Sequence, residues 1–184
     1  MMEAYNNVTY LLSNDIKMNE KYMERVEIPK ESAKNIQYLK KNQTYNISDS
    51  LVVTTLTSTD EGVAFLIEYK GQLIYYAGDL NWWSWKGETQ EEYEDMTSRF
   101  QREMKKLEGK KIKVAFLPLD PRQEERFCWG FDYYMKMTDT LHAFPMHFWE
   151  DPSVIDKLKN MDIAAGYKER IEMVDAEGKT FYIS

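Results

Sequence analysis

The sequence predicts a layered α/β domain, and two observations support that class. Several apolar runs rich in β-branched and aromatic residues have the composition of strands, and several of them end in polar loops. Segments with the apolar spacing of helices lie between the later runs. This alternation is typical of sheets covered by helices. Because we find no repeat, linker or low-complexity tract, residues 1–184 are expected to form one domain.

Composition and charge exclude several classes of protein. Hydrophobic residues make up 43% of the chain and aromatic residues 14%, which is not a disordered composition. The formal net charge of −7, with acidic and basic residues interspersed, argues against nucleic-acid binding. No apolar run approaches the roughly 20 residues of a membrane-spanning helix. The single cysteine, Cys128, excludes an internal disulfide, so we expect a cytoplasmic protein.

The first elements are expected to be strands with one short helix among them. Asn7–Ser13 and Leu51–Ser58 have the composition of strands, whereas Glu31–Lys41 has the spacing of a short helix. Val63–Tyr69 and Leu73–Gly78 flank a Lys-Gly dipeptide, which predicts a β-hairpin with its turn at that dipeptide.

The clearest helix signal follows the hairpin. Thr89 can cap the helix, and Glu92, three residues later, can complete a capping box. Gly109 is expected to end the helix. The apolar residues between these signals share one face, as expected for a helix on a core: Tyr93, Met96, Phe100, Met104 and Leu107.

The last third of the chain is expected to continue the alternation. Lys113–Asp120 contains a continuous apolar run ended by Pro118, which predicts a strand buried on both faces. A second helix is expected from about residue 130 to 142, followed by a short strand at Ala143–Phe148.

The end of the chain is expected to add one more helix and a hairpin. Asp151 and Pro152 suit the N-cap and first position of that helix. Glu169–Ser184 has the pattern of a closing hairpin around an Ala-Glu-Gly turn. The inner face of the helix would carry Val154, Ile155, Leu158 and Met161.

Polar residues gather in three loops after predicted strands, at 79–85, 120–122 and 147–151. Functional sites in layered α/β folds usually lie in such loops. The first loop is the most unusual, because three tryptophans follow Asp79 within six residues. Asp79 therefore either does chemistry or closes a turn under an aromatic lid, with Gly78 supplying the turn's backbone angle.

The residues alone give no metal motif. The chain holds two histidines, His142 and His147, and no H-x-H, H-x-x-x-H or C-x-x-C pair. His147 can be a ligand or an ordinary loop histidine, and both interpretations stay open. Asp120 and Arg122 match no ligand motif and are expected to form a local ion pair at a strand end.

Taken in order, however, three segments resemble a known family. They are the stretch from Ser58 to Trp85, then "VAFLPLDPR", then "FPMHFWED". This order resembles the metal-dependent hydrolases of the metallo-β-lactamase fold, in particular members of uncertain substrate. The resemblance runs from about residue 7 to 158. It implies a four-layer αββα sandwich of mixed sheets with flanking helices, and a one- or two-metal site at one edge of the sheets.

The resemblance also implies roles for individual residues. Asp79 would be a carboxylate shared by two metals, and His147 would be a ligand of the second metal. Zinc or another divalent cation would lower the pKa of a bound water, and the resulting hydroxide would attack an ester, amide or phosphoester. Aromatic side chains would form either a substrate wall or a plain lid: Tyr76, Trp82, Trp83, Trp85 and Trp149. We favour the lid for at least two of the three loop tryptophans.

The sequence departs from the family at one important point. The family's opening segment, with its H-x-H-x-D-H motif, supplies most of the metal ligands and is expected before Asn7–Ser13, where this sequence lacks it. Tyr76 and Ser84 also stand where related sequences often carry histidine. Two protein ligands are fewer than the three of a catalytic zinc site. We therefore expect a truncated sandwich that binds zinc weakly or not at all.

Three functions remain open on this basis. The chain can be a hydrolase homologue that is inactive on its own, whether its opening segment was lost, lies on another polypeptide or was removed by a misplaced start codon. It can be a non-catalytic domain that binds a small molecule or a protein in the aromatic cleft around Asp79. It can also be a structural partner in a hetero-oligomer.

The folded chain is expected to have further properties that the structure can test. Asp79 and His147 should lie close together at one end of the sheets, and His142 should not point toward Asp79. Cys128 should be structural and inert, because its neighbours are apolar. Loss of the opening segment should expose a sheet edge, so a second copy or a partner chain should cover the strand at Asn7–Ser13.

Overall fold

The computed structural model describes residues 8–16 and 18–183, and its strands form two sheets. Six strands lie in the order β3-β4-β5-β6-β7-β8, antiparallel from β3 to β6 and parallel from β6 to β8. A separate parallel pair is formed by β1 and β2. The strands are β1 Tyr10–Ser13, β2 Ile36–Leu39, β3 Thr44–Ser48, β4 Leu51–Thr57, β5 Val63–Tyr69, β6 Gln72–Tyr76, β7 Lys111–Pro118 and β8 Asp139–Met146.

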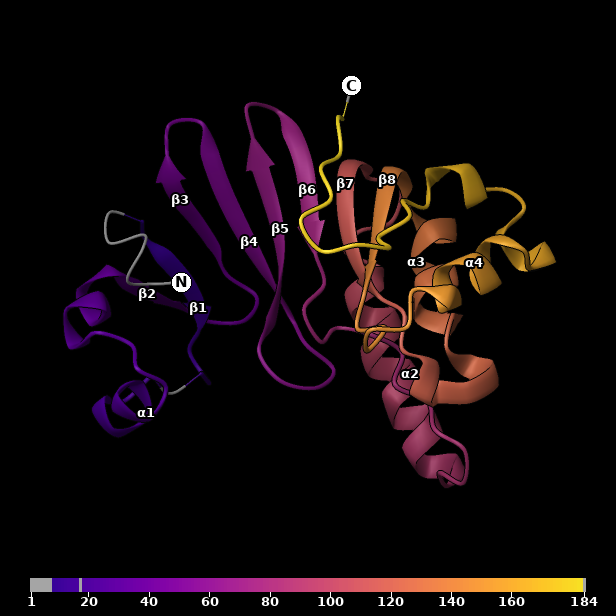
Figure 1. Ribbon diagram of the computed structural model, residues 1–184, viewed down its shortest axis with the longest axis horizontal. Helices are drawn as coiled ribbons and strands as arrows, with labels where there is room; N and C mark the ends of the chain where they lie inside the picture. The colour runs from indigo at the N-terminus through magenta and orange to yellow at the C-terminus, as the bar shows by residue number, and fades with distance from the viewer. Residues whose placement is uncertain (1–7, 17, 184) are drawn as a thin grey trace.

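Helices lie at both ends of the molecule, as Figure 1 shows. α2, α3 and α4 gather beside β7 and β8, whereas α1 lies with β1 and β2 at the opposite end. A mixed α/β fold with a mixed sheet and flanking helices is therefore confirmed. Within the described ranges, no helix combines the length and apolar character that crossing a bilayer requires. The helices are α1 Glu20–Arg25, α2 Gln90–Met104, α3 Trp129–Met137 and α4 Ser153–Lys159, with 3-10 turns η1 Lys30–Asn35, η2 Pro121–Arg126, η3 Asp162–Ala164 and η4 Lys168–Arg170.

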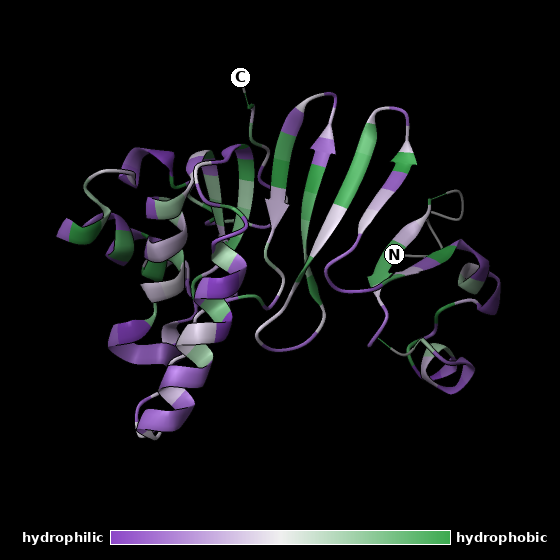
Figure 2. Cartoon of the chain, turned by 180° about the vertical axis from the view of Figure 1, so that it is seen from behind, coloured by the Kyte–Doolittle hydropathy of each residue, from purple (hydrophilic) through white to green (hydrophobic). Residues whose placement is uncertain are grey.

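The predicted hairpin and the predicted capping box are both present. Lys70 and Gly71 join β5 to β6 with φ angles of 49° and 75°, the left-handed backbone of a tight hairpin turn. The Thr89 hydroxyl accepts the Glu92 backbone N–H, and the Glu92 carboxylate accepts the Thr89 N–H. α2 ends at Met104, with Gly109 at φ 69° five residues later. Figure 2 shows much of α2 as hydrophilic, with hydrophobic patches between, as expected for a helix with one buried face.

The prediction of a helix at Glu31–Lys41 is wrong. A 3-10 turn, η1, covers Lys30–Asn35, and the chain then enters β2. β2 pairs with β1, and Leu39 at its end is fully buried. An isolated helix of this length is marginal in water, so the pairing with β1 and the burial of Leu39 decide the conformation.

The predicted second helix is too long, and the predicted closing hairpin is absent from the described residues. α3 ends at Met137, and Asp139–Met146 forms β8, which extends the short strand expected at Ala143–Phe148. β8 pairs with β7 along its whole length. This pairing satisfies backbone groups at the edge of β7, which would lack a sheet partner if α3 continued to residue 142. After η4, a single bridge joins Ile171 to Ala143, and no ladder forms within residues 172–183.

The prediction that β7 is buried on both faces is correct for one face. Leu117 points toward α2 and α3 and is buried. Phe116, on the opposite face, is half-buried between Tyr76 and Phe144, with ring centroids 5.9 and 5.3 Å away. The C-terminal segment crosses in front of this face in Figure 1, and Phe181 packs edge-on against Phe144.

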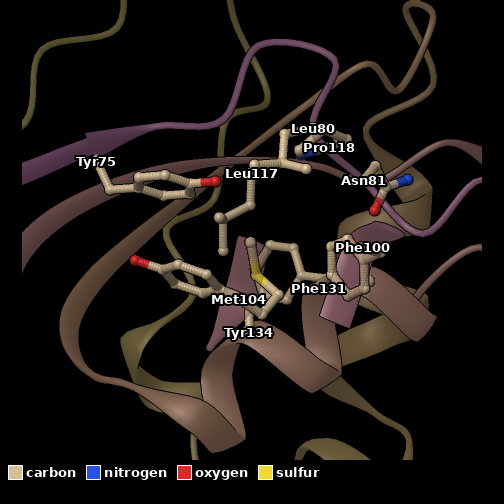
Figure 3. Close-up of a pocket in the computed structure, with 10 residues that line it drawn as sticks. Tyr75, Leu80, Asn81, Phe100, Met104, Leu117, Pro118, Phe131 and Tyr134 are labelled. Carbon is tan, nitrogen blue, oxygen red and sulfur yellow. The ribbon is translucent and has the colours of Figure 1, made fainter. Parts of the chain in front are cut away.

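The core lies between β6, β7 and the helices α2 and α3. Figure 3 shows the rings of Tyr75 and Tyr134 facing each other, and their centroids are 5.1 Å apart. Burial is the main cause that raises the pKa of Tyr75 well above its ordinary value. Side chains from both layers enclose a cavity of about 10 Å³, among them Leu80, Phe100, Met104 and Phe131. This packing fixes the ends of β6 and β7, from which two of the three polar loops leave the sheet.

Candidate functional site

Asp79 and His147 meet at one edge of the six-stranded sheet. Asp79 follows β6 through the buried Ala77 and through Gly78, whose φ is 55°. His147 follows β8 directly. Because β6, β7 and β8 are parallel, their carboxyl ends lie at the same edge. The His147 Nε2 lies 2.9 Å from Asp79 Oδ1, so the prediction that these residues are neighbours is confirmed.

The backbone after β8 is held in an unusual conformation. His147, Trp149 and Glu150 have φ angles of 66°, 49° and 63°. Left-handed backbone is uncommon for residues with a side chain, and such positions concentrate at functional sites. Here this backbone turns the His147 imidazole toward Asp79.

The carboxylate of Asp79 favours the protonated form of His147. Its hydrogen bond is the largest effect on the pKa of His147 and raises it, while partial burial of the ring opposes the shift. The charges of Asp79 and Asp120 raise this pKa further, and the Arg122 charge lowers it. The net pKa of His147 lies above its ordinary value, so the pair carries ion-pair character.

Trp83 braces this pair from one side. Its indole N–H donates to the Asp79 backbone carbonyl at 2.8 Å, and its ring meets the His147 ring edge-on at 5.7 Å between centroids. Trp83 is nearly fully buried, and Trp85 stacks on it in an almost parallel orientation, at 6.0 Å. Trp83 therefore holds the loop, whereas Trp85 is partly exposed beside it.

Asp120 and Arg122 form the expected local ion pair, within a larger cluster. The Asp120 side chain is 0% exposed and accepts two N–H donors of the Arg122 guanidinium, from Nε at 2.9 Å and from Nη2 at 2.5 Å. The indole N–H of Trp149 donates to the same carboxylate at 3.2 Å, and the Arg122 guanidinium lies 4.3 Å from the Trp149 ring. Burial alone would raise the pKa of Asp120, but these hydrogen bonds outweigh it and lower that pKa.

Trp82 and Ser84 lie apart from the Asp79–His147 pair, whereas Tyr76, at the end of β6, lies on the same side of the sheet edge as Asp79. Trp82 packs between α2 and α3, against Phe100 and Trp129, and its N–H donates to Thr97. Tyr76 is exposed on the open face of the sheet. Ser84 is fully buried and accepts a hydrogen bond from Arg126 at 2.8 Å.

Sequence reasoning missed the residue that ties the loops together, Gln123. Its buried amide accepts from Asn81 at 3.1 Å and donates to the Trp82 carbonyl at 2.9 Å and the Ser84 carbonyl at 3.2 Å. These bonds join η2 to the loop after β6. No local pattern marks a glutamine for this role, because its partners lie about 40 positions earlier.

A groove opens on the other side of Asp79 and was also missed. Its volume is about 360 Å³, and it lies between β1 and the strands β5 and β6. Apolar side chains form much of its wall, while Ser13, Glu61 and Asp79 contribute polar groups. The lining residues are Leu11, Leu12, Ser13, Ile16, Glu61, Gly62, Val63, Phe65, Tyr76, Gly78 and Asp79.

The donor set around Asp79 does not fit a catalytic zinc. Among residues 8–16 and 18–183, no three side chains of His, Cys, Asp or Glu gather in a way that could hold a metal ion. Asp79 and His147 are bonded to each other, and the nearby Asp120 is occupied by Arg122 and Trp149. A catalytic zinc takes three protein ligands.

His142 and Cys128 lie outside the site, as expected. His142 is on β8, and its Nδ1 is 2.7 Å from a Glu172 carboxylate oxygen. Cys128 is buried, and burial is the main cause that raises the pKa of its thiol. A thiol in that state has little thiolate character.

Comparison with solved structures identifies the fold. A proposed metal-dependent hydrolase from Parabacteroides distasonis is 16% identical, with 94% of this chain and 80% of that chain covered and a TM-score of 0.56. A proposed zinc-dependent hydrolase of the metallo-β-lactamase superfamily from Thermotoga maritima is 14% identical, with 61% and 50% covered and a TM-score of 0.31. Zinc-bound PqqB from Methylobacterium extorquens is 12% identical, with 84% and 58% covered and a TM-score of 0.39.

The likeness to the first of these structures supports the fold relationship that the sequence predicted. The other two superpose too loosely to carry an argument. At 16% identity the likeness shows the fold alone, so neither metal nor substrate is transferred from it. No sequence-family profile matches the chain, and neither does any curated protein.

Proposed function

We propose that this protein is a homologue of metal-dependent hydrolases with the metallo-β-lactamase fold, and that this chain alone has an incomplete metal site and no hydrolytic activity. One observation carries the proposal. The carboxylate and the imidazole that would be metal ligands are hydrogen-bonded to each other, at 2.9 Å.

The surroundings of the pair support this proposal. Asp120 is a further carboxylate whose charge acts on His147, but it is buried and neutralised by Arg122. Taking it as a third ligand would break its bonds to Arg122 and Trp149. Removing one partner of a buried charged pair is costly. Asp79 and His147 are therefore better placed as an ion pair that shapes the cleft than as ligands awaiting a third.

Metal analysis tests the proposal. The purified chain is incubated with zinc, dialysed exhaustively and analysed for metal by mass spectrometry. We expect far less than one zinc per chain and no hydrolysis of generic ester or phosphoester substrates. His147→Ala is compared with the control His142→Gln, which alters a histidine of β8 that pairs with Glu172 and not with Asp79.

Stoichiometric zinc that survives dialysis would contradict the proposal if His147→Ala removes it and His142→Gln does not. Hydrolysis that depends on His147 would contradict it in the same way. Equal and low zinc in all three proteins is the result that supports it.

A second function, non-catalytic ligand binding, is favoured by the groove beside Asp79. Its volume of about 360 Å³ is within the range of small-molecule sites, and Asp79 lies where it meets the loop after β6. Outside the groove, the exposed indoles of Trp85 and Trp149 flank Arg122. In this function the fold supplies a shaped cleft, and Asp79 contributes a fixed negative charge.

A further inference from the structure

The groove between β1 and β5 has the charge and the lining of a site for an organic cation. Two carboxylates, Glu61 and Asp79, are part of its wall, and none of the described residues that line it is basic. Asp15 lies just beyond the wall, where its carboxylate accepts the Gly62 N–H at 3.1 Å. His147 offsets part of the Asp79 charge, since it is bonded to one of its oxygens. The groove therefore keeps an acidic character along the Glu61 side.

Aromatic and aliphatic side chains form the rest of the groove. Phe65 and Tyr76 are neighbours on paired strands, with ring centroids 6.5 Å apart, and both line it. Leu11 and Ile16 contribute from the β1 side. Aromatic faces attract cations as well as apolar groups, so this wall suits a ligand with both.

A buried hydroxyl supplies an independent sign of a missing partner. Ser13 is 2% exposed and belongs to the groove wall, and its Oγ has no hydrogen-bond partner among the described residues. A buried polar atom without a partner costs free energy, so such atoms usually face a water or a ligand. An N–H donor in the groove would supply the partner that Ser13 lacks after a small adjustment of the side chain.

We propose that this groove binds a small primary ammonium compound with an aromatic or short aliphatic body. The ammonium group lies between Glu61 and Asp79, and the apolar body lies against Phe65, Tyr76 and Leu11. This inference rests on the proposed function, because a metal ion on Asp79 would compete for the same charge. It adds the chemical class of the ligand.

The test compares three probes of nearly equal shape by protein NMR: 2-phenylethylammonium, 2-phenylethanol and 3-phenylpropionate. We expect the ammonium to bind about tenfold more tightly than the alcohol, from one ion pair and one cation–π contact. We expect the carboxylate to bind more weakly than the alcohol. The amide signals of Gly62 and Gly78, both in the groove, should report the binding.

Two matched variants locate the charge that matters. Glu61→Gln should bring the affinity for the ammonium close to that for the alcohol. Glu68→Gln neutralises an exposed carboxylate on β5, outside the groove lining, and should leave the affinity unchanged. Added salt should weaken ammonium binding and leave alcohol binding unaltered.

Equal binding of the ammonium and the alcohol, or loss of binding in both variants, would overturn the inference. Measuring zinc in the same samples separates this failure from that of the proposed function. If the protein contains no zinc and does not prefer the ammonium probe, only the ammonium site is refuted. A zinc-loaded protein refutes the proposed function, and the ammonium site with it if zinc also displaces the probe.

Discussion

At the scale of single residues, the Asp79–His147 contact is the feature that most directly links structure to chemistry. Both residues stand at strand ends, and the left-handed backbone at His147 directs its ring to the carboxylate. Trp83 fixes the other side of Asp79 through its backbone carbonyl. The contact therefore depends on two loops that pack tightly, and its charge state depends on pH.

The titration of His147 is the prediction that belongs to this scale. Its pKa should lie above the ordinary value of 6.5, because the Asp79 carboxylate accepts its hydrogen bond. Asp79→Asn should lower that pKa toward or below 6.5. NMR titration of the imidazole C–H signals measures it, and the chain's only other histidine is assigned with His142→Gln.

The raised pKa of His147 also predicts the direction in which the stability of the protein changes with pH. A histidine whose pKa is raised by folding stabilises the folded state fully below pH 6.5, and this stabilisation is lost as the pH rises through the higher folded value. The stability gap between the natural chain and Asp79→Asn should therefore be larger at pH 6 than at pH 8 in urea unfolding. A gap independent of pH, or an unchanged pKa in Asp79→Asn, would contradict the ion-pair description.

At the scale of elements, the loop after β6 is held by its packing against α3 and η2. An added Cβ at Gly130, on α3, would lie 1.9 Å from Asn81 Oδ1 and 3.0 Å from the Trp82 backbone nitrogen. Asn81 is buried, and its amide is bonded to Gln123. The side chain therefore has little freedom to move away, and only glycine fits this contact between helix and loop.

Gly130→Ala should consequently destabilise the protein, although alanine favours helices. Overpacking a core typically costs about 1–3 kcal/mol. Alanine recovers roughly 1 kcal/mol of this through its higher helix propensity, so the cost is only partly offset over most of the range. Urea unfolding followed by tryptophan fluorescence measures the change in the free energy of unfolding. A net loss of up to about 2 kcal/mol is expected after that offset.

Gly166→Ala provides the matched control for this substitution. An added Cβ at Gly166 meets no atom within 4 Å, and its φ is not in the left-handed region. This variant should be neutral or slightly more stable, by up to about 0.5 kcal/mol. If both alanines have the same effect, close packing at Gly130 does not hold the loop.

At the scale of the whole molecule, exposed apolar side chains concentrate around the two-stranded sheet of β1 and β2. Of the large hydrophobic residues that are exposed, several belong to residues 8–39, which include β1, α1 and β2: Val8, Ile16, Tyr22, Val26 and Tyr38. β1 pairs with β2 along one edge. Exposed apolar groups beside a strand edge are typical of association surfaces.

We therefore expect a homodimer or a tight partner at this end of the molecule. Light scattering coupled to gel filtration should give a mass near twice 21.9 kDa for the purified chain. Tyr38→Glu should shift that mass to the monomer, because the new charge would be buried in the interface. Tyr69→Glu alters an exposed tyrosine of β5 outside this set and should leave the mass unchanged.

A monodisperse monomer at all concentrations, or equal effects of the two substitutions, would count against self-association through this surface. A monomer whose residues 8–39 also resist proteolysis would show that the chain covers its own edge. A dimer that only Tyr38→Glu dissociates is the result expected.

The sequence by itself determined the elements whose signals are local. The Lys-Gly hairpin turn, the capping box of α2 and the strand at Leu51–Thr57 each depend on residues a few positions apart. Short-range geometry and hydrogen bonding decide such features before the rest of the chain folds. The order of three segments also predicted the fold and the meeting of Asp79 with His147.

Only the tertiary structure decided the features that depend on distant partners. Glu31–Lys41 became a turn and a strand because β1 offered an edge, and the segment at 139–142 became a strand because β7 did. Trp82 packs into the helices while Trp83 faces His147, a difference between adjacent residues that composition does not reveal. The groove exists because β1 lies beside β5. Such contacts are set by burial and pairing over the whole chain, which outweigh local preference wherever that preference is weak.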